Sequence, residues 1–291
     1  MSVYALLRSV PKFYNVPSKN RGLNIINAGH AFGQPNEGVK MAPSVILHNQ
    51  YGLIYRLKSL YKDTNLKIVT HNNYNTLKNF PSHFKTLTIG GDHMVAFDSI
   101  AYQLDKNPQS KVGVLYVDSH ADINTGASSL TKNRHGMVVS NLMKIDRSFP
   151  NKYPRKKLCY EDIVYVGLRS LDPFEKMLLV NKSINFYSTD RVKLEGSYNV
   201  VSEILSQHFK HYDHIHVSFD VDVIDPILFP ATGTPVPDGL FMDDIIGITT
   251  ALQEDDRVQS MDLVEYDPSK DTEGFLCGQI CNDIIVNSLI I

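Results

Sequence analysis

Asp118-Ser119-His120-Ala121-Asp122 directly follows the apolar run Val112-Gly113-Val114-Leu115-Tyr116-Val117. The apolar run predicts a buried parallel strand. Ligands of open α/β sheets collect beyond the carboxyl ends of strands, so a charged cluster here is more typical of a site than of a solvated face. Two other apolar runs also end in His or Asp: Leu87-Thr88-Ile89 before Gly90-Gly91-Asp92-His93, and Ile215-His216-Val217 before Ser218-Phe219-Asp220-Val221-Asp222.

Apolar runs alternate with helical patterns along almost the whole chain. The strands that we expect are Leu23–Asn27, Lys67–Thr70, Thr86–Ile89, Val112–Val117, Asp162–Gly167, Ile184–Tyr187, Ile215–Phe219 and Val258–Val264. The helices that we expect are one opened by Pro43 and carrying Val45 to Leu57, one between His93 and Pro108, and Val200–Phe209, Asp243–Leu252 and Phe275–Val286. Such alternation predicts an α/β fold with a mostly parallel, about eight-stranded sheet covered on both faces. No repeat or linker interrupts the pattern, so we expect residues 1–291 to form one domain.

Composition narrows the class of partner. The chain has 29 basic and 31 acidic residues, a net charge of −2. This balance lacks the basic stripe of nucleic-acid or anionic-membrane binding and favours a small-molecule substrate or a protein partner. No run approaches the roughly 18 apolar residues of a membrane span.

Two features bear on the compartment. The three cysteines show no C-x-x-C spacing, which fits a reducing compartment such as the cytoplasm. Residues 1–21, in contrast, carry Arg8, Lys12, Lys19 and Arg21, and no acidic residue precedes Glu37. This basic N-terminal extension resembles a mitochondrial transit peptide, but a floppy basic tail would look the same. Both alternatives stay open.

The candidate site is rich in hard ligands. It contains two His and four Asp and no thiolate: His93, Asp118, His120, Asp122, Asp220 and Asp222. This set suits manganese or a similar divalent ion better than structural zinc. Residues two apart on an extended segment point to the same side, so both Asp-containing motifs could reach one pocket. Six ligands are too many for one ion but suit two ions about 3.5–4 Å apart, an arrangement that predicts hydrolysis.

Each motif alone favours a simpler interpretation. An isolated Asp-x-Asp is usually a turn or a calcium-decorated loop, and a lone His is usually a hydrogen-bonded structural residue. Three motifs at three strand ends reverse that preference, because they share one structural context.

The three motifs together resemble the manganese signatures of the ureohydrolase (arginase) family, in the same chain order. The resemblance runs from Gly33-Gln34-Pro35 to Pro268. It implies a three-layer αβα fold with two Mn²⁺ per subunit at the carboxyl edge of the sheet. It also implies that His93, Asp118, Asp122 and Asp220 hold one ion, and that Asp118, His120, Asp220 and Asp222 hold the other.

The resemblance also implies a substrate and a reaction. Asn124, Thr131 and Asn133 are similar to the residues that donate to the α-carboxylate of L-arginine, and Asp172 to the residue that faces its α-amino group. Thr234 matches a hydrogen-bonding position, Glu265 the carboxylate that grips the guanidinium, and His135 the proton shuttle, with Asp122 as an inner proton relay. The expected reaction is hydrolysis of L-arginine to L-ornithine and urea by a hydroxide that bridges the ions.

Several positions depart from the family pattern. Met94 and Ser119 stand where Ser and Ala are common, and Arg134 replaces an apolar residue beside the substrate loop. The alternatives are an agmatinase or another guanidino or formimino hydrolase of the family, a non-catalytic metal-binding homologue, and an unrelated two-metal phosphoesterase. A homo-oligomer is one expectation, although we also expect the long C-terminal tail that many members use between subunits to be absent.

Overall fold

The computed structural model describes residues 22–48, 52–60, 67–71, 84–146, 154–271 and 275–289. Eight strands form one sheet in the order β2-β1-β3-β8-β7-β4-β5-β6, and every neighbouring pair is parallel. The strands are β1 (Gly22–Ala28), β2 (Lys67–His71), β3 (Lys85–Gly90), β4 (Val112–Val117), β5 (Ile163–Leu168), β6 (Asn185–Ser188), β7 (His214–Asp220) and β8 (Val258–Val264). All eight predicted strands are confirmed, each to within one residue at either end. The predicted basic extension at residues 1–21 lies outside the described residues.

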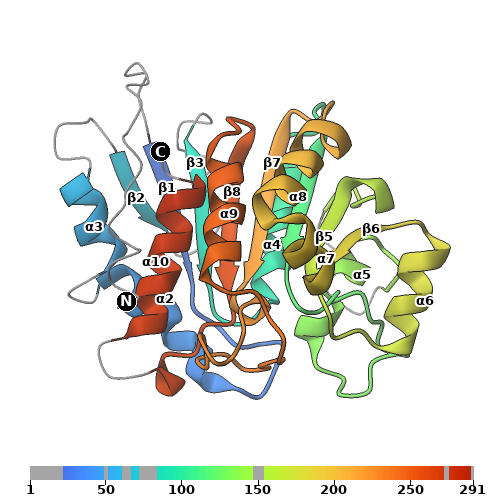
Figure 1. The fold of residues 1–291 in the computed structure, drawn as a ribbon, viewed down its shortest axis with the longest axis horizontal. Coiled ribbons are helices and arrows are strands. Elements are labelled where there is room, and N and C mark those ends of the chain that lie inside the picture. The colour runs from blue at the N-terminus through green and yellow to red at the C-terminus, as the bar shows by residue number, and fades with distance from the viewer. Residues whose placement is uncertain are drawn as a thin grey trace.

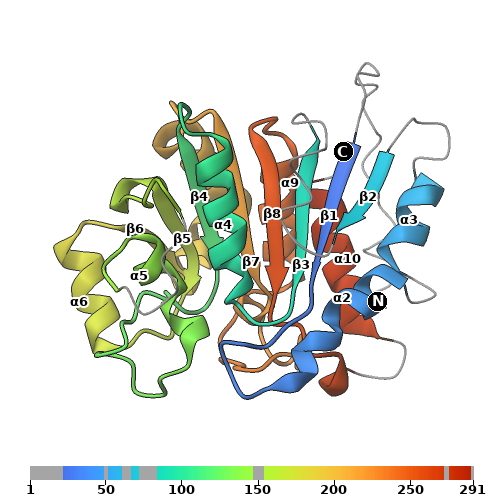
Figure 2. The same cartoon turned by 180° about the vertical axis from the view of Figure 1, so that it is seen from behind.

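Helices cover both faces of the sheet, so the predicted three-layer αβα fold is confirmed (Figures 1 and 2). The helices are α2 (Ala42–His48), α3 (Leu53–Leu60), α4 (Val95–Lys106), α5 (Val138–Leu142), α6 (Pro173–Asn181), α7 (Thr189–Glu195), α8 (Ser197–Glu203), α9 (Met242–Gln253) and α10 (Leu276–Leu289). Buried side chains of α2, α3 and α7–α10 pack in one hydrophobic cluster with one face of the sheet. Those of α4, α5 and α6 pack on the other face.

The central strands are buried on both faces, and β7 carries apolar side chains on one face and hydrogen-bonded polar side chains on the other. Every residue of β4 is buried, as expected for a parallel strand between two helical layers. On β7, Val217 and Phe219 point into the cluster under α8–α10, whereas His216 and Ser218 point toward α4. The two faces of β7 therefore differ in polarity.

Two helical predictions need correction. The helix opened by Pro43 is two helices, α2 and α3, and the residues between them include 49–51, which are not described. The helix predicted at Val200–Phe209 is α8 followed by a π-helical turn at Ile204–His208. Helix α6 was not predicted, although Asp172 and Glu175 form a capping box around Pro173 at its first turn. That capping signal was present in the sequence.

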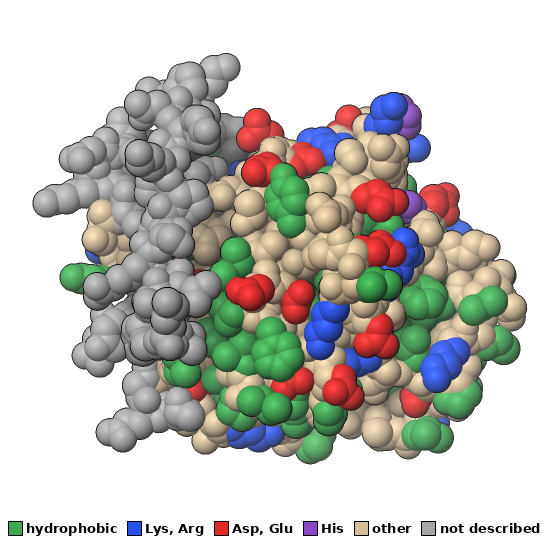
Figure 3. Space-filling view, viewed as in Figure 1, with side chains coloured by type: hydrophobic (Ala, Val, Ile, Leu, Met, Phe, Trp, Pro, Cys, Tyr) green, Lys and Arg blue, Asp and Glu red, His purple; other side chains and the backbone are tan. Residues whose placement is uncertain are grey.

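The surface over α7, α8 and α9 mixes acidic and basic side chains with scattered apolar ones (Figure 3). Among the described residues, no helix is both long enough and apolar enough to cross a membrane.

Candidate metal centre

Four neighbouring strands deliver predicted site residues to one edge of the sheet. In the order β3-β8-β7-β4, their carboxyl ends lead to His93, Glu265, Asp220 and Asp118. The two middle strands of this group are the last two in the chain, so distant motifs become neighbours. A Cβ at Gly91 would collide with the carbonyl oxygen of His30, and only glycine allows this close approach before His93.

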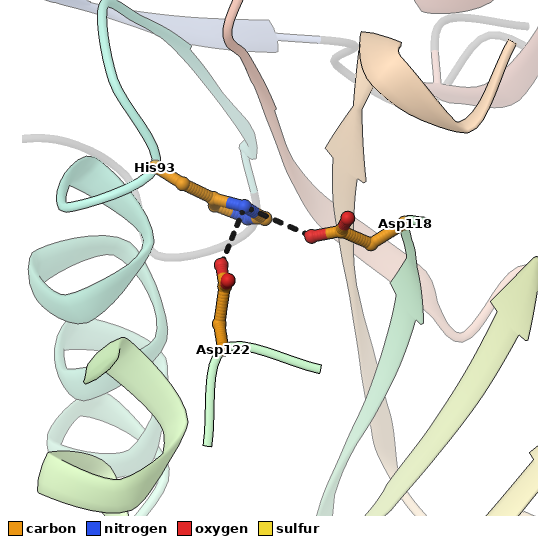
Figure 4. Close-up of side chains that lie close together, drawn as sticks. All are labelled: His93, Asp118 and Asp122. Carbon is orange, nitrogen blue, oxygen red and sulfur yellow. Dashed lines mark ion pairs between the residues drawn. The ribbon is translucent and has the colours of Figure 1, made fainter. Parts of the chain in front are cut away.

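His93 lies at the centre of three carboxylates. Its Nδ1 is 3.1 Å from Asp118 Oδ2, 3.0 Å from Asp122 Oδ2 and 3.1 Å from Asp220 Oδ2. Figure 4 shows Asp118 and Asp122 reaching the same ring from the end of β4 and from the loop beyond it. His93 is only 1% exposed and stacks on Tyr116, with ring centroids 4.8 Å apart. The sequence prediction that these three motifs converge is therefore supported by their geometry.

A line of hydrogen bonds fixes which nitrogen of His93 faces the carboxylates. Ser218 Oγ donates to Asp262 Oδ1 at 2.7 Å, so it accepts from His93 Nε2 at 3.0 Å. The proton of a neutral His93 then resides on Nε2, which leaves the Nδ1 lone pair directed at the carboxylates. Such a partner on the far nitrogen is typical of metal-binding histidines.

The line of hydrogen bonds continues beneath α4, away from the site. His216 Nε2 lies 2.8 Å from Asp262 Oδ2, and its Nδ1 lies 2.9 Å from Ser260 Oγ. Ser260 Oγ in turn lies 2.9 Å from His214 Nε2. Burial, followed by the nearby charges of His216 and Lys106, lowers the pKa of His214 to about 3. We call Ser218, Asp262, His216, Ser260 and His214 the polar seam. The sequence analysis did not assign it a role.

A second group of ligands shares Asp118 with the first. One atom each of Asp118, His120 and Asp222 lies within 4.8 Å of the others, and the same holds for His93, Asp118 and Asp122. His120 Nδ1 is 3.0 Å from Asp222 Oδ2 and 3.6 Å from Asp118 Oδ1. Asp118 therefore belongs to both groups of candidate ligands.

The ligands converge through turns, and the expectation of extended segments was wrong. Asp122 has a left-handed backbone with φ of 50°, which is uncommon for a non-glycine residue. Asp220 ends β7 and caps a short 3₁₀ turn (Val221–Val223) by accepting from the backbone N–H of Asp222 at 2.8 Å. Strain of this kind is found at sites where the surrounding structure holds a functional side chain in place.

The charge balance of the site fits divalent cations. Asp118, Asp220 and Asp222 are all buried, and Asp118 Oδ2 has no hydrogen-bond partner. Burial and the charges of Asp222 and Asp122 raise the pKa of Asp118 to about 6. Burial and the charges of Asp222 and Asp118 raise the pKa of Asp220 well above its ordinary value. These carboxylates repel one another as ions, and cations between them would remove that repulsion.

A cavity of about 220 Å³ opens beside the ligands. Its lining includes most of the residues predicted for ligands and substrate: His120, Asp122, Asn124, Thr131, Asn133, His135, Asp172, Asp220, Asp222 and Thr234. It also includes Ser129, Gly136, Ser170 and Glu175, which sequence reasoning missed. Three predicted residues, His93, Asp118 and Glu265, are buried behind the lining.

At one end of the cavity, an amide side chain that donates hydrogen bonds is paired with a carboxylate that accepts them. Asn124 Nδ2 donates to Asp172 Oδ2 at 2.9 Å, and Ser128 Oγ donates to Asn124 Oδ1 at 2.8 Å. Glu175 accepts from the backbone N–H groups of Ile123 and Asp172 at 3.2 and 3.0 Å. Burial is the main cause that raises the pKa of Glu175 to about 7. This end can bind a group with both an anionic and a cationic part.

Glu265 is buried, and both of its carboxylate oxygens contact hydrogen-bonding groups. It is 0% exposed, and its backbone has a φ of 66°. Oε1 accepts from the backbone N–H of His93 at 2.8 Å and lies 2.9 Å from His135 Nδ1, while Oε2 accepts from Gln34 at 2.5 Å. A substrate cation that bonds to the same oxygens would compete with His135 and Gln34.

Comparison with known proteins agrees with this geometry. The model of the Arginase family matches residues 23–287. This chain belongs to the arginase family. It is 33% identical over 279 residues to a non-hepatic arginase of Xenopus laevis, which covers 84% of this chain and 76% of that protein. It is 32% identical over 283 residues to human arginase-1, which covers 87% of each chain.

A solved structure extends the likeness to the whole fold. The arginase of Entamoeba histolytica in complex with L-ornithine superposes with a TM-score of 0.82 at 26% identity, and the match covers 94% of this chain and 99% of the other. The protein is therefore an arginase-family hydrolase with a His/Asp cluster at the carboxyl edge of an eight-stranded parallel sheet.

Proposed function

We propose that this protein is a dinuclear manganese hydrolase that converts L-arginine to L-ornithine and urea. The observation that carries the proposal is the single cavity that joins two unlike ends. At one end, Asn124 and Asp172 form a paired donor and acceptor. At the other end, His120, Asp220 and Asp222 belong to the ligand cluster. L-Arginine has an α-amino acid group at one end and a guanidinium at the other, so it matches both.

The ligand sets divide around Asp118. His93, Asp118, Asp122 and Asp220 would hold one manganese ion, and Asp118, His120, Asp220 and Asp222 the other. When bound, such a pair supplies a nucleophile from water at neutral pH and stabilises negative charge on the reacting carbon's substituents. Carboxylate and imidazole ligands without thiolates suit manganese.

The far end of the cavity would select an amino acid. Asp172 accepts hydrogen bonds only, as an ionised carboxylate does, and it suits the α-ammonium group. Asn124, Thr131 and Asn133 line the same cavity and offer amide or hydroxyl donors to the α-carboxylate. Agmatine lacks that carboxylate, so binding it would leave these donors without their partner, a loss that discriminates strongly between substrates.

Glu265 and His135 would act as a pair at the reacting end. Burial lowers the pKa of His135, but the hydrogen bond and charge of Glu265 outweigh it and raise the pKa above 6.5. The contact with Glu265 therefore favours the protonated form of His135. A guanidinium that replaces His135 on Glu265 would release the imidazolium, which can protonate the leaving amine of ornithine. Asp122, a member of the first ligand group, would relay the proton from the attacking water.

The test is urea release by manganese-loaded protein offered L-arginine and agmatine in parallel, with a metal-free control. We expect manganese-dependent urea from L-arginine and little from agmatine. Asp172→Asn should lower kcat/KM for L-arginine by about 10–100-fold, because a charge-assisted hydrogen bond contributes about 1.5–3 kcal/mol, and it should keep its manganese. Activity on agmatine alone would contradict the amino-acid assignment of Asp172 and Asn133. No turnover of either compound by metal-loaded protein would favour another guanidino or formimino substrate or a non-catalytic role.

We further propose that the chain forms one domain that acts in the cytoplasm. One sheet takes strands from residue 22 to residue 264, which supports a single folding unit. Cys159, Cys277 and Cys281 are free thiols, which fits a reducing compartment. Cell fractionation of the tagged chain would test the location, and recovery in mitochondria would assign the basic residues 1–21 a targeting role. Ultracentrifugation would test for a homo-oligomer.

A further inference from the structure

Ser119 stands between two residues of the metal centre and bonds to two of its ligands. It is 0% exposed. Its Oγ lies 2.6 Å from Asp222 Oδ1 and 2.9 Å from His120 Nδ1. The backbone N–H of Ser119 also donates to Asp222 Oδ1, at 3.3 Å. An alanine at this position would keep the backbone N–H contact with Asp222 and lose both contacts of the hydroxyl.

The Ser119 hydroxyl has one proton, and the distances from Oγ to Asp222 and His120 indicate which of them accepts it. A short contact of 2.6 Å between an oxygen and a carboxylate is typical of an O–H group that donates to the charged acceptor. Ser119 Oγ then accepts from His120 Nδ1 while that nitrogen carries a proton. A cation on His120 Nδ1 would end this second bond but leave the bond to Asp222 intact.

The two oxygens of Asp222 consequently have different surroundings. Oδ1 receives two donors from Ser119, the hydroxyl and the backbone N–H. Oδ2 lies 3.0 Å from His120 Nδ1, among the converging ligand atoms, and accepts from Thr234 Oγ1 at 3.1 Å.

We propose that Ser119 is a positioning residue that restricts Asp222 to one oxygen, Oδ2, as a ligand of the second cation. A carboxylate can bind a metal through one or both oxygens, and a donor fixed on Oδ1 competes with the metal for that oxygen. The consequence is one coordination position that Asp222 does not fill and that water or substrate can use. This inference rests on the two-cation part of the proposed function and adds a residue that controls its geometry.

The test is the crystal structure of manganese-loaded wild type and Ser119→Ala, supported by X-ray absorption in solution. In wild type, we expect only Oδ2 of Asp222 within bonding distance of the second ion. In Ser119→Ala, Oδ1 retains only the 3.3 Å backbone bond and should join the ion, which raises the number of ligand oxygens by one. The substitution removes one buried oxygen and adds no atom, so the variant should fold.

Two further variants make the result specific. Ser119→Thr keeps the hydroxyl and should restore binding through one oxygen. Ser218→Ala removes a buried hydroxyl that serves His93, at the other ion, and should leave the binding mode of Asp222 as in wild type. Asp222 bound through both oxygens in wild type, or through one oxygen in Ser119→Ala, would overturn the role of Ser119.

The structural readout does not depend on turnover. Loaded protein that shows the expected change at Asp222 but releases no urea from L-arginine would uphold Ser119 and contradict the proposed reaction. Loaded wild-type crystals without a cation against Asp222 would contradict both this inference and the pair of cations.

Discussion

The two faces of the central sheet are built from the same strands but do different work. On β7 and β8 the residues Val217, Phe219 and Leu263 face α8–α10 and are packed among aliphatic side chains. Their neighbours in sequence face α4 and form the polar seam, which reaches His93 through Ser218. One face therefore stabilises the fold by burying apolar area, and the other fixes a ligand by directional bonds.

The polar seam can be buried because its polar groups have hydrogen-bond partners. Asp262 accepts from Ser218 and His216 at 2.7 and 2.8 Å, so its charge has two donors inside the protein. Buried polar groups are costly only when they lack partners. Beyond the seam, at the carboxyl edge, Asp118 Oδ2 lies 3.1 Å from His93 Nδ1 but accepts no hydrogen bond. Cations are the partners that this edge requires.

The largest expected effect is on the aliphatic face. Phe219→Ala should lower the free energy of unfolding by about 3–5 kcal/mol, because it leaves a cavity at a fully buried site. The folded fraction should still bind manganese with wild-type stoichiometry, since Phe219 contacts no ligand through its side chain. Urea denaturation and metal analysis of the native fraction measure both quantities. Loss of manganese from fully folded Phe219→Ala would show that the faces are not separate in function.

Asp262→Asn breaks the polar seam at its acceptor and should cost about 3 kcal/mol of stability, as expected when one partner of a buried charged pair is removed. Unlike folded Phe219→Ala, folded Asp262→Asn should also bind manganese about 10–100-fold more weakly than wild type, because Ser218 no longer holds the Nε2 proton of His93 in place. Metal titration of the folded variant is the measurement. Wild-type affinity with reduced stability would make the seam purely structural.

The seam also predicts a pH dependence. His214 has a pKa of about 3 when folded and about 6.5 when unfolded, so the unfolded chain binds the extra proton between these values. Its contribution to stability is complete above pH 6.5 and falls as the pH drops, by about 2 kcal/mol at pH 5. His214→Gln should remove this part of the acid destabilisation. Denaturation of both proteins at pH 7.5 and pH 5 gives the difference, and an unchanged difference would contradict a buried neutral His214.

The smallest effect on stability is expected for Ser218→Ala. Removing this hydroxyl should cost about 1–2 kcal/mol, because Asp262 retains its bond to His216. Manganese affinity should fall by roughly tenfold, less than in Asp262→Asn, since Asp262 itself remains. Calorimetric titration with Val217→Ala as the matched control on the opposite face would separate the two roles. Equal metal affinity in Ser218→Ala and Val217→Ala would contradict the seam's role.

Much of the fold was predictable because the strands are buried runs of aliphatic residues. The eight strands followed from short apolar segments bounded by turns, and their alternation with helices indicated a parallel sheet. The helix at Pro43 was wrong in extent because an apolar pattern continues across the break between α2 and α3. Helix α5 was missed because it spans only Val138–Leu142, too short for a periodic signal.

The sequence alone determined the ligand types, since His and Asp at three strand ends specify a hard metal site whatever the sheet order. Only the tertiary structure decided that β3, β8, β7 and β4 are neighbours, that left-handed turns aim Asp122 and Glu265, and that Ser218 and Asp262 orient His93. The physical reason is the distance along the chain over which each kind of signal acts. Residue chemistry and hydrophobic periodicity are local, whereas a hydrogen bond between Gln34 and Glu265, or between Ser119 and Asp222, depends on which distant segments the fold brings together.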